Sequence, residues 1–63
     1  MKIPQSEKPV MTYVFDGIDC YRVTRNAVGK YTLYKILKGD YQKIKTDDSA
    51  IKFDEIVKKD RSN

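Results

Sequence analysis

Alternating apolar and polar residues predict a β-hairpin early in the chain. Two runs show this alternation, at residues 11–15 and 18–23. Between them stands Asp16-Gly17, a dipeptide favoured in type I′ turns because both central residues of such a turn need positive φ. We therefore predict two antiparallel strands, at residues 10–15 and 18–25, joined by a two-residue loop.

Two further strands are predicted later in the chain from their composition and alternation. Residues 31–37 are rich in aromatic and β-branched side chains, and residues 41–46 alternate strictly. Residues 26–29 and 38–40 contain the glycines and polar side chains typical of turns. Lysines along the last run would discourage pairing at an exposed sheet edge. The pattern predicts a four-stranded antiparallel meander.

The period of the pattern changes near the C-terminus. A run of capping residues stands at positions 46–49, and after it Ala50, Phe53, Ile56 and Val57 recur at helical spacing. Acids gather at the start of this segment and bases at its end, as the helix dipole favours. We predict a helix over residues 49–59, with a fifth strand at residues 50–53 as the alternative. The fold class is then α+β, a small four-stranded antiparallel β-meander with one C-terminal helix packed on one face.

The length of the chain bounds its organisation. Sixty-three residues make one domain. Pro4 and Pro9 disfavour helix before them, so residues 1–9 are expected to form an extended or flexible N-terminal arm. Residues 10–60 are expected to form the single α+β domain. A chain this short buries only about 60% of its unfolded surface, and such domains usually need a staple, a metal or a partner.

Composition argues against several classes of function. The chain has no histidine and one cysteine, which removes histidine-based catalysis, histidine metal sites and an internal disulfide. Its isolated glycines serve turns and form no phosphate-binding loop. We expect no enzymatic activity, no metal, no cofactor and no small-molecule substrate. No apolar stretch approaches the ~20 residues of a membrane span, and no signal segment is evident, so a cytoplasmic location without membrane contact is expected.

The two-residue loop determines which side chains share a face. It sets Phe15 opposite Ile18 and Tyr13 opposite Cys20. One face then carries Met11, Tyr13, Phe15, Ile18 and Cys20, and we expect the helix to cover it. On this face Cys20 would act as a small apolar filler.

Two registers remain open for the third and fourth strands. With loops at residues 26–29 and 39–40, the core gains Tyr31, Leu33, Leu37 and Ile44, and Lys35 must extend out of the core face. With loops one residue longer, Lys35 moves outside while Tyr34 and Ile36 move in. The first register is favoured because Gly39-Asp40 suits a two-residue loop. In both registers Ile44 points to the core.

Charge and aromatic residues converge on the helix-free face of the predicted sheet. The net charge is +4, and the excess of bases lies in residues 21–45. A local positive field attracts phosphates or acidic proteins, and an open aromatic face is typical of a contact surface. The candidate binding residues are Tyr21, Arg25, Tyr34, Tyr41, Lys43 and Lys45.

These residues support two hypotheses of function. The first is a non-enzymatic binding module that acts through protein–protein contacts on the helix-free face, by self-association as a homodimer or homo-oligomer or with an acidic protein partner. The alternative is single-stranded nucleic-acid binding, with bases stacked on tyrosines and phosphates held by Arg and Lys. In size, basicity and lack of catalytic residues the chain is similar to small accessory proteins of phages and mobile elements. That resemblance transfers no residues and implies a protein-binding surface.

Overall fold

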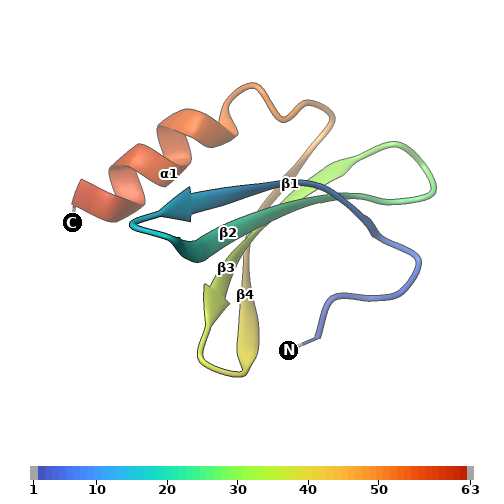
Figure 1. Ribbon diagram of the computed structural model, residues 1–63. Coiled ribbons are helices and arrows are strands. Elements are labelled where there is room, and N and C mark those ends of the chain that lie inside the picture. The colour runs from blue at the N-terminus through green and yellow to red at the C-terminus, as the bar shows by residue number, and fades with distance from the viewer. Residues whose placement is uncertain (1, 63) are drawn as a thin grey trace.

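The fold is a single antiparallel sheet with one helix on one face, as the sequence predicts. The computed structural model describes residues 2–62. Its elements are β1 (Lys8–Phe15), β2 (Ile18–Arg25), β3 (Tyr31–Leu37), β4 (Asp40–Asp47) and α1 (Phe53–Ser62). The strands are ordered β1-β2-β3-β4 in a twisted sheet, and α1 follows the last strand (Figure 1). The predicted α+β meander is confirmed.

Both tight hairpins are joined by two-residue loops. At the first, Asp16 has φ 54° and Gly17 has φ 75°, the two positive values that a type I′ turn requires. At the second, Leu37 faces Asp40, so the loop is Lys38-Gly39. The predicted loop at residues 39–40 is therefore wrong by one residue.

A β-bulge in β2 reverses the faces of the residues after it. Val14 faces Asp19, but the next pair is Tyr13 with Tyr21, which leaves Cys20 as an extra residue. One inserted residue turns every later side chain of the strand to the opposite face. Tyr21 therefore lies on the helix side, and the prediction that it lies on the helix-free face is wrong. Arg25, four residues further along β2, is turned the same way.

A bulge in β4 changes the position of one predicted site residue. Leu33 faces Lys45 and Tyr34 faces Lys43, so Ile44 is the extra residue. Lys45 thus shares the helix side of the sheet with Leu33, contrary to prediction. Lys43 stays on the helix-free face, as predicted.

The hydrophobic core lies between the sheet and α1. Its buried members are Tyr21, Val23, Leu33, Phe53 and Val57, and the partly buried residues packed against it are Tyr13, Phe15, Cys20, Tyr31, Ile44, Ala50 and Ile56. Three residues predicted for the core remain exposed, at 42% for Met11, 64% for Ile18 and 42% for Leu37. They lie on the edge strand β1 or beside a hairpin loop, where a helix of ten residues does not cover them.

The helix begins four residues later than predicted. Ser49 Oγ accepts a hydrogen bond from the Ile51 amide at 3.2 Å, and the Phe53 amide donates to the Ala50 carbonyl at 3.1 Å. These bonds form a turn before the helix, so Ser49 caps that turn instead of α1. The predicted apolar stripe is confirmed, since Phe53 and Val57 are its buried residues. Within residues 2–62, no helix has the length and hydropathy needed to cross a membrane.

A binding groove between the N-terminal arm and the sheet

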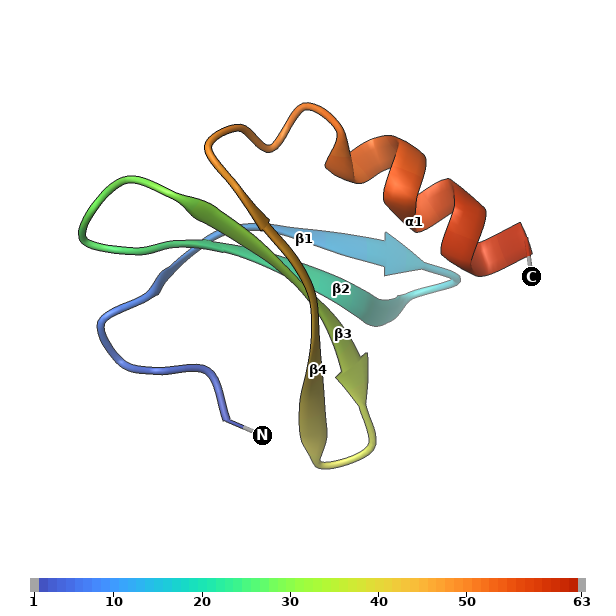
Figure 2. The same ribbon diagram turned by 180° about the vertical axis from the view of Figure 1, so that it is seen from behind.

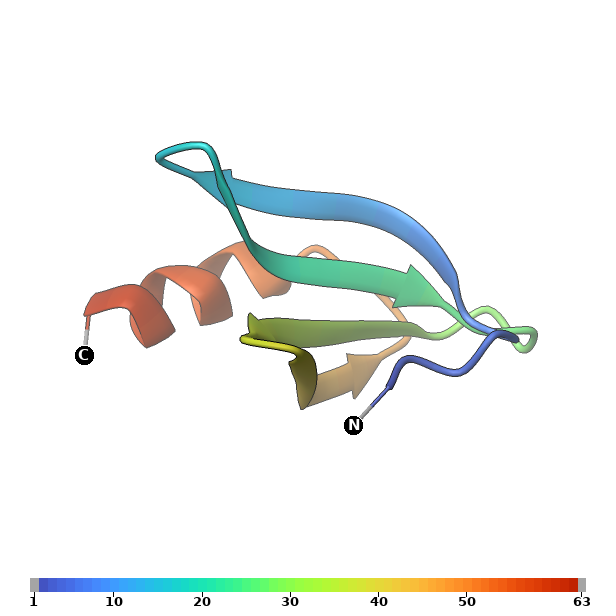
Figure 3. The same cartoon turned by 60° about the horizontal axis from the view of Figure 1, so that its bottom comes forward.

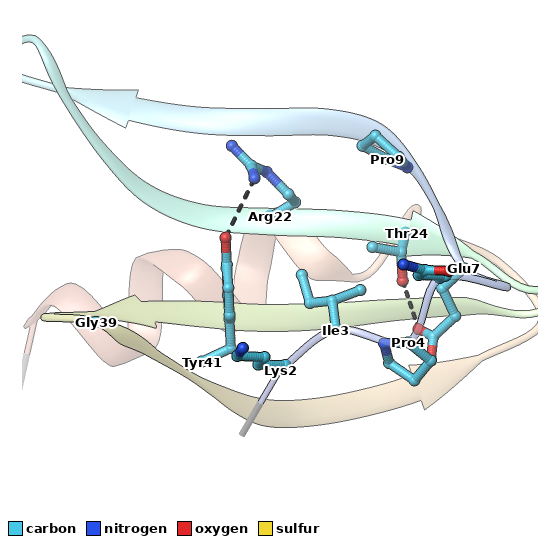
Figure 4. Close-up of a pocket in the computed structure, with 10 residues that line it drawn as sticks. Lys2, Ile3, Pro4, Glu7, Pro9, Arg22, Thr24, Gly39 and Tyr41 are labelled. Carbon is cyan, nitrogen blue, oxygen red and sulfur yellow. Dashed lines mark hydrogen bonds between the residues drawn. The ribbon is translucent and has the colours of Figure 1, made fainter.

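The N-terminal arm folds back across the face of the sheet that the helix leaves uncovered. The Glu7 amide donates to the Pro4 carbonyl at 3.0 Å, which closes a turn just before β1. Ile3 and Pro4 lie in front of the sheet, with α1 behind it (Figure 4). Figure 2 shows the same return of the arm from behind. The expectation of an open sheet face is therefore wrong, because the chain covers part of that face itself.

Glu7 holds the arm to the sheet through one carboxylate oxygen. Its Oε1 accepts hydrogen bonds from Thr24 Oγ1 at 2.7 Å and from the Tyr34 hydroxyl at 2.8 Å. Both donors are buried, with Thr24 1% and Tyr34 0% exposed. Burial, and then the adjacent Glu7 carboxylate, raise the pKa of Tyr34 to about 12. Tyr34 is thus an anchor for the arm and offers no surface on which a base could stack.

Arg22 occupies the position on this face that Tyr21 was expected to take. It stands opposite Tyr34 in the β2–β3 pairing. Its Nη1 donates to the Tyr41 hydroxyl at 3.3 Å, and its Nε donates to Thr12 Oγ1 at 3.4 Å. Its Nη2 lies 3.8 Å from Asp19 Oδ2. Sequence reasoning missed Arg22 because regular alternation from the first hairpin places it on the helix side, and only the bulge at Cys20 brings it here.

A groove of about 450 Å³ lies between the arm and the sheet. Figure 4 shows Tyr41 rising from β4 toward Arg22 along one wall of it. The Tyr41 ring packs edge-on against Tyr34, with centroids 6.2 Å apart. The groove is lined by Lys2, Ile3, Pro4, Gln5, Glu7, Pro9, Arg22, Thr24, Gly39 and Tyr41.

The charge of the groove is positive. Lys2 and Arg22 line it with one acid, Glu7. The Oε1 atom of Glu7 already accepts two hydrogen bonds from the sheet, which offsets part of its negative field. Lys43 belongs to the same face. The site therefore combines an aromatic wall, two cations and apolar arm residues.

The six predicted binding residues divide between the two faces. Tyr34, Tyr41 and Lys43 lie on the helix-free face, and the other three lie on the helix side. There, the Tyr21 hydroxyl donates to Asp60 Oδ2, and burial followed by this contact raises the pKa of Tyr21 to about 12. The Arg25 guanidinium stacks over the Tyr31 ring at 5.6 Å, and Lys45 Nζ lies 3.9 Å from Asp47 Oδ2.

The described residues contain no group of three or more His, Cys, Asp or Glu side chains placed to hold a metal ion. Comparison of the chain with protein-family models, curated proteins and solved structures finds no match. The function therefore has to be argued from the geometry of the groove.

Proposed function

We propose that the protein is a non-enzymatic binding module that holds a short acidic segment of a partner protein in the arm–sheet groove. The observation that carries this proposal is Arg22 on the wall of a 450 Å³ groove lined by two cations and one acid. Its side chain is 29% exposed, so part of the guanidinium reaches solvent. A guanidinium has five N–H donors. Arg22 uses two of them on hydroxyls, and its Nη2 lies 3.8 Å from Asp19 Oδ2, so two donors remain for an incoming carboxylate.

The remaining groove residues suit a peptide. Tyr41 is half-buried and supplies an aromatic wall, and tyrosine and arginine are enriched at protein interfaces. Ile3 and Pro4 supply apolar contact area on the opposite side of the groove. Lys2 and Lys43 add positive charge that would speed the encounter with an acidic partner.

Single-stranded nucleic acid is the less favoured ligand. Base stacking needs a row of exposed aromatic rings. Tyr34 is 0% exposed and Tyr21 is 2% exposed, on the other face of the sheet. Tyr41 alone of the three predicted stacking tyrosines lines the groove.

The test is selection of peptides from a random library on the folded protein. We expect enriched peptides to be rich in Asp and Glu, and the best of them to bind about tenfold more weakly to Arg22→Gln, since a charge-assisted hydrogen bond contributes roughly 1.5–3 kcal/mol. Lys58→Gln is the matched control, because Lys58 is exposed on α1 and its loss should leave the affinity unchanged.

Two results would overturn the proposal. One is equal affinity of the selected peptides for the wild type and for Arg22→Gln. The other is tighter binding of an oligothymidylate than of any selected peptide, with the steep salt dependence of phosphate contacts. Circular dichroism of each variant confirms that the comparison is made on folded protein.

A further inference from the structure

Another pocket lies at the end of the sheet where β1 begins. Figure 3 shows the start of β1 beside the β2–β3 loop at one end of the molecule. The pocket between these segments has a volume of about 390 Å³. It is lined by Ser6, Lys8, Arg25, Asn26, Ala27 and Gly29. None of these residues lines the arm–sheet groove, so the two sites are separate.

Two cations line this pocket, and no acid does. Lys8 and Arg25 stand directly opposite each other in the β1–β2 pairing. Like charges in that arrangement destabilise a sheet, because side chains of paired residues lie on the same face. Within residues 2–62, neither side chain forms an ion pair with a carboxylate. The fold therefore concentrates positive charge here without an acidic partner.

Arg25 is held in place by contacts that leave its N–H donors free. Its guanidinium stacks over the Tyr31 ring, 5.6 Å from the centroid. A Cβ at Gly29 would lie 3.4 Å from Arg25 Nη2, so the guanidinium also lies close to the backbone of the loop. Stacking on a ring leaves the edge of a guanidinium open to an anion. A side chain that is positioned beforehand loses less conformational entropy when a ligand binds.

The neutral side chains of the pocket can donate as well. Asn26 Oδ1 accepts hydrogen bonds from the amides of Val28 at 3.1 Å and Lys30 at 2.9 Å. Since its oxygen is occupied, Asn26 is left with its Nδ2 group to offer a ligand. Ser6 adds a hydroxyl, which can also donate. The lining thus combines two cations with two neutral donors.

We propose that this pocket binds the phosphate of a phosphomonoester. Such a group carries a charge of about −1.5 to −2 at pH 7, and its three terminal oxygens accept hydrogen bonds. This charge balances that of Lys8 and Arg25 together, and an arginine can hold a phosphate through two parallel N–H bonds. A bound phosphate would also offset the repulsion between the two cations.

The positive charge is too local to suit a nucleic-acid strand. Such a strand needs cations that follow its backbone. Lys30 is the next cation along the β2–β3 loop, and its Nζ lies 3.9 Å from Asp48 Oδ1, so its charge is already paired. Two cations therefore suit a single phosphate. A terminal monoester also brings more charge to them than one phosphodiester of a strand does.

NMR titration with methyl phosphate tests the site. We expect saturable shifts of the amides of residues 26–29, and an affinity about tenfold lower for Lys8→Gln, since one charge-assisted contact is lost. Lys58→Gln, at an exposed position on α1, is the matched control and should bind as the wild type does. The proposal is overturned by an absence of saturable shifts, or by equal affinity of Lys8→Gln and the wild type.

The pH dependence separates phosphate binding from a general attraction of anions. The second pKa of a phosphomonoester is about 6, whereas sulfate keeps both charges above and below this pH. The chain has no histidine and the pocket has no acid, so affinity for methyl phosphate should rise from about pH 5 to pH 7 while that for sulfate stays constant. Parallel curves for the two ions would contradict the proposal.

A stability measurement gives an independent readout. Lys8→Glu sets an acid opposite Arg25, so it should abolish methyl phosphate binding and raise the free energy of unfolding of the free protein. A lower free energy of unfolding for Lys8→Glu would disprove the repulsion on which the proposal rests.

Competition experiments identify the source of the phosphate. A short phosphoserine peptide that binds more tightly than methyl phosphate indicates a phosphorylated protein, and equal affinity indicates a small phosphate ester. Acidic peptides selected on the groove should not compete with methyl phosphate, because the two sites share no lining residue. Competition by these peptides, or tighter binding of an oligothymidylate than of methyl phosphate, would overturn the assignment.

Discussion

At the scale of single residues, three tyrosines of the sheet donate hydrogen bonds from their hydroxyls to carboxylates. Tyr13 donates to Asp54 at 2.5 Å, and Tyr21 and Tyr34 donate to Asp60 and Glu7. Burial of each phenol, followed by the hydrogen bond to its acid, raises the pKa of all three to about 12 from the usual 10.0. The folded protein therefore retains these protons at pH values where the unfolded chain releases them.

Stability should accordingly fall in alkali. Below pH 10 both states are protonated, and the hydrogen bonds contribute fully. Between pH 10 and about 12 the unfolded state loses protons that the folded state keeps, so the free energy of unfolding decreases as pH rises. Urea unfolding at successive pH values measures this slope. Tyr34→Phe removes one of the three groups and should make the slope shallower, whereas an unchanged slope would contradict the assignment.

At the scale of elements, polar contacts fix α1 to the sheet around its apolar stripe. Lys35 lies on the helix side of β3, and its Nζ forms an ion pair with Asp60 Oδ2 at 3.1 Å. This ion pair balances the positive charge of Lys35 beside the core. The hydrogen bonds from Tyr21 and Lys35 lower the pKa of Asp60. Near the end of the helix, the Arg61 guanidinium stacks over the Phe15 ring at 3.7 Å. These contacts orient the helix, while burial of Phe53 and Val57 supplies most of its packing.

Truncation of the helix stripe should be costly. Phe53 is 0% exposed, and we expect Phe53→Ala to lower the free energy of unfolding by about 3–5 kcal/mol, as large core truncations do. Ile51→Ala, two residues before the helix at a position 84% exposed, should change it by less than about 0.5 kcal/mol. Chemical denaturation of both variants measures the difference. Similar losses for the two variants would mean that α1 does not cover the sheet as described.

At the scale of the whole molecule, the sheet is covered on both faces. α1 covers one face, and the N-terminal arm covers part of the other, where Glu7 accepts hydrogen bonds from the buried Thr24 and Tyr34. Thr32 is also buried on this face. Thr32 also shares a hydrogen bond of 3.0 Å with Thr46 on that face. For a chain of 63 residues with one cysteine, this second layer adds buried surface that a single helix could not supply.

Removal of the arm should therefore destabilise the domain. Deletion of residues 1–7 removes both hydrogen bonds to Glu7 and exposes the side chains beneath the arm. We expect a loss of about 2 kcal/mol or more in the free energy of unfolding, measured by urea titration. Glu7→Ala should give part of this loss, and Gln5→Ala, at an exposed position of the arm, should give little. A deletion without effect would show that the arm does not pack on the sheet.

The local structure of the chain can be predicted from its sequence alone. Backbone preferences and hydrophobic periodicity act between residues close in the chain. They predict the Asp16-Gly17 turn, the four strands, and the helix stripe of Phe53 and Val57. For the candidate site, the same signals placed Tyr34, Tyr41 and Lys43 on the helix-free face.

Which other side chains lie on that face depends on how the assembled strands pair. The bulges at Cys20 and Ile44 moved Tyr21, Arg25 and Lys45 to the helix side. No glycine marks either bulge, because neither Cys20 nor Ile44 has a positive φ. The return of the arm depends on Glu7 meeting Thr24 and Tyr34, partners distant in sequence. Periodicity cannot show such contacts, since they exist only once the sheet is assembled.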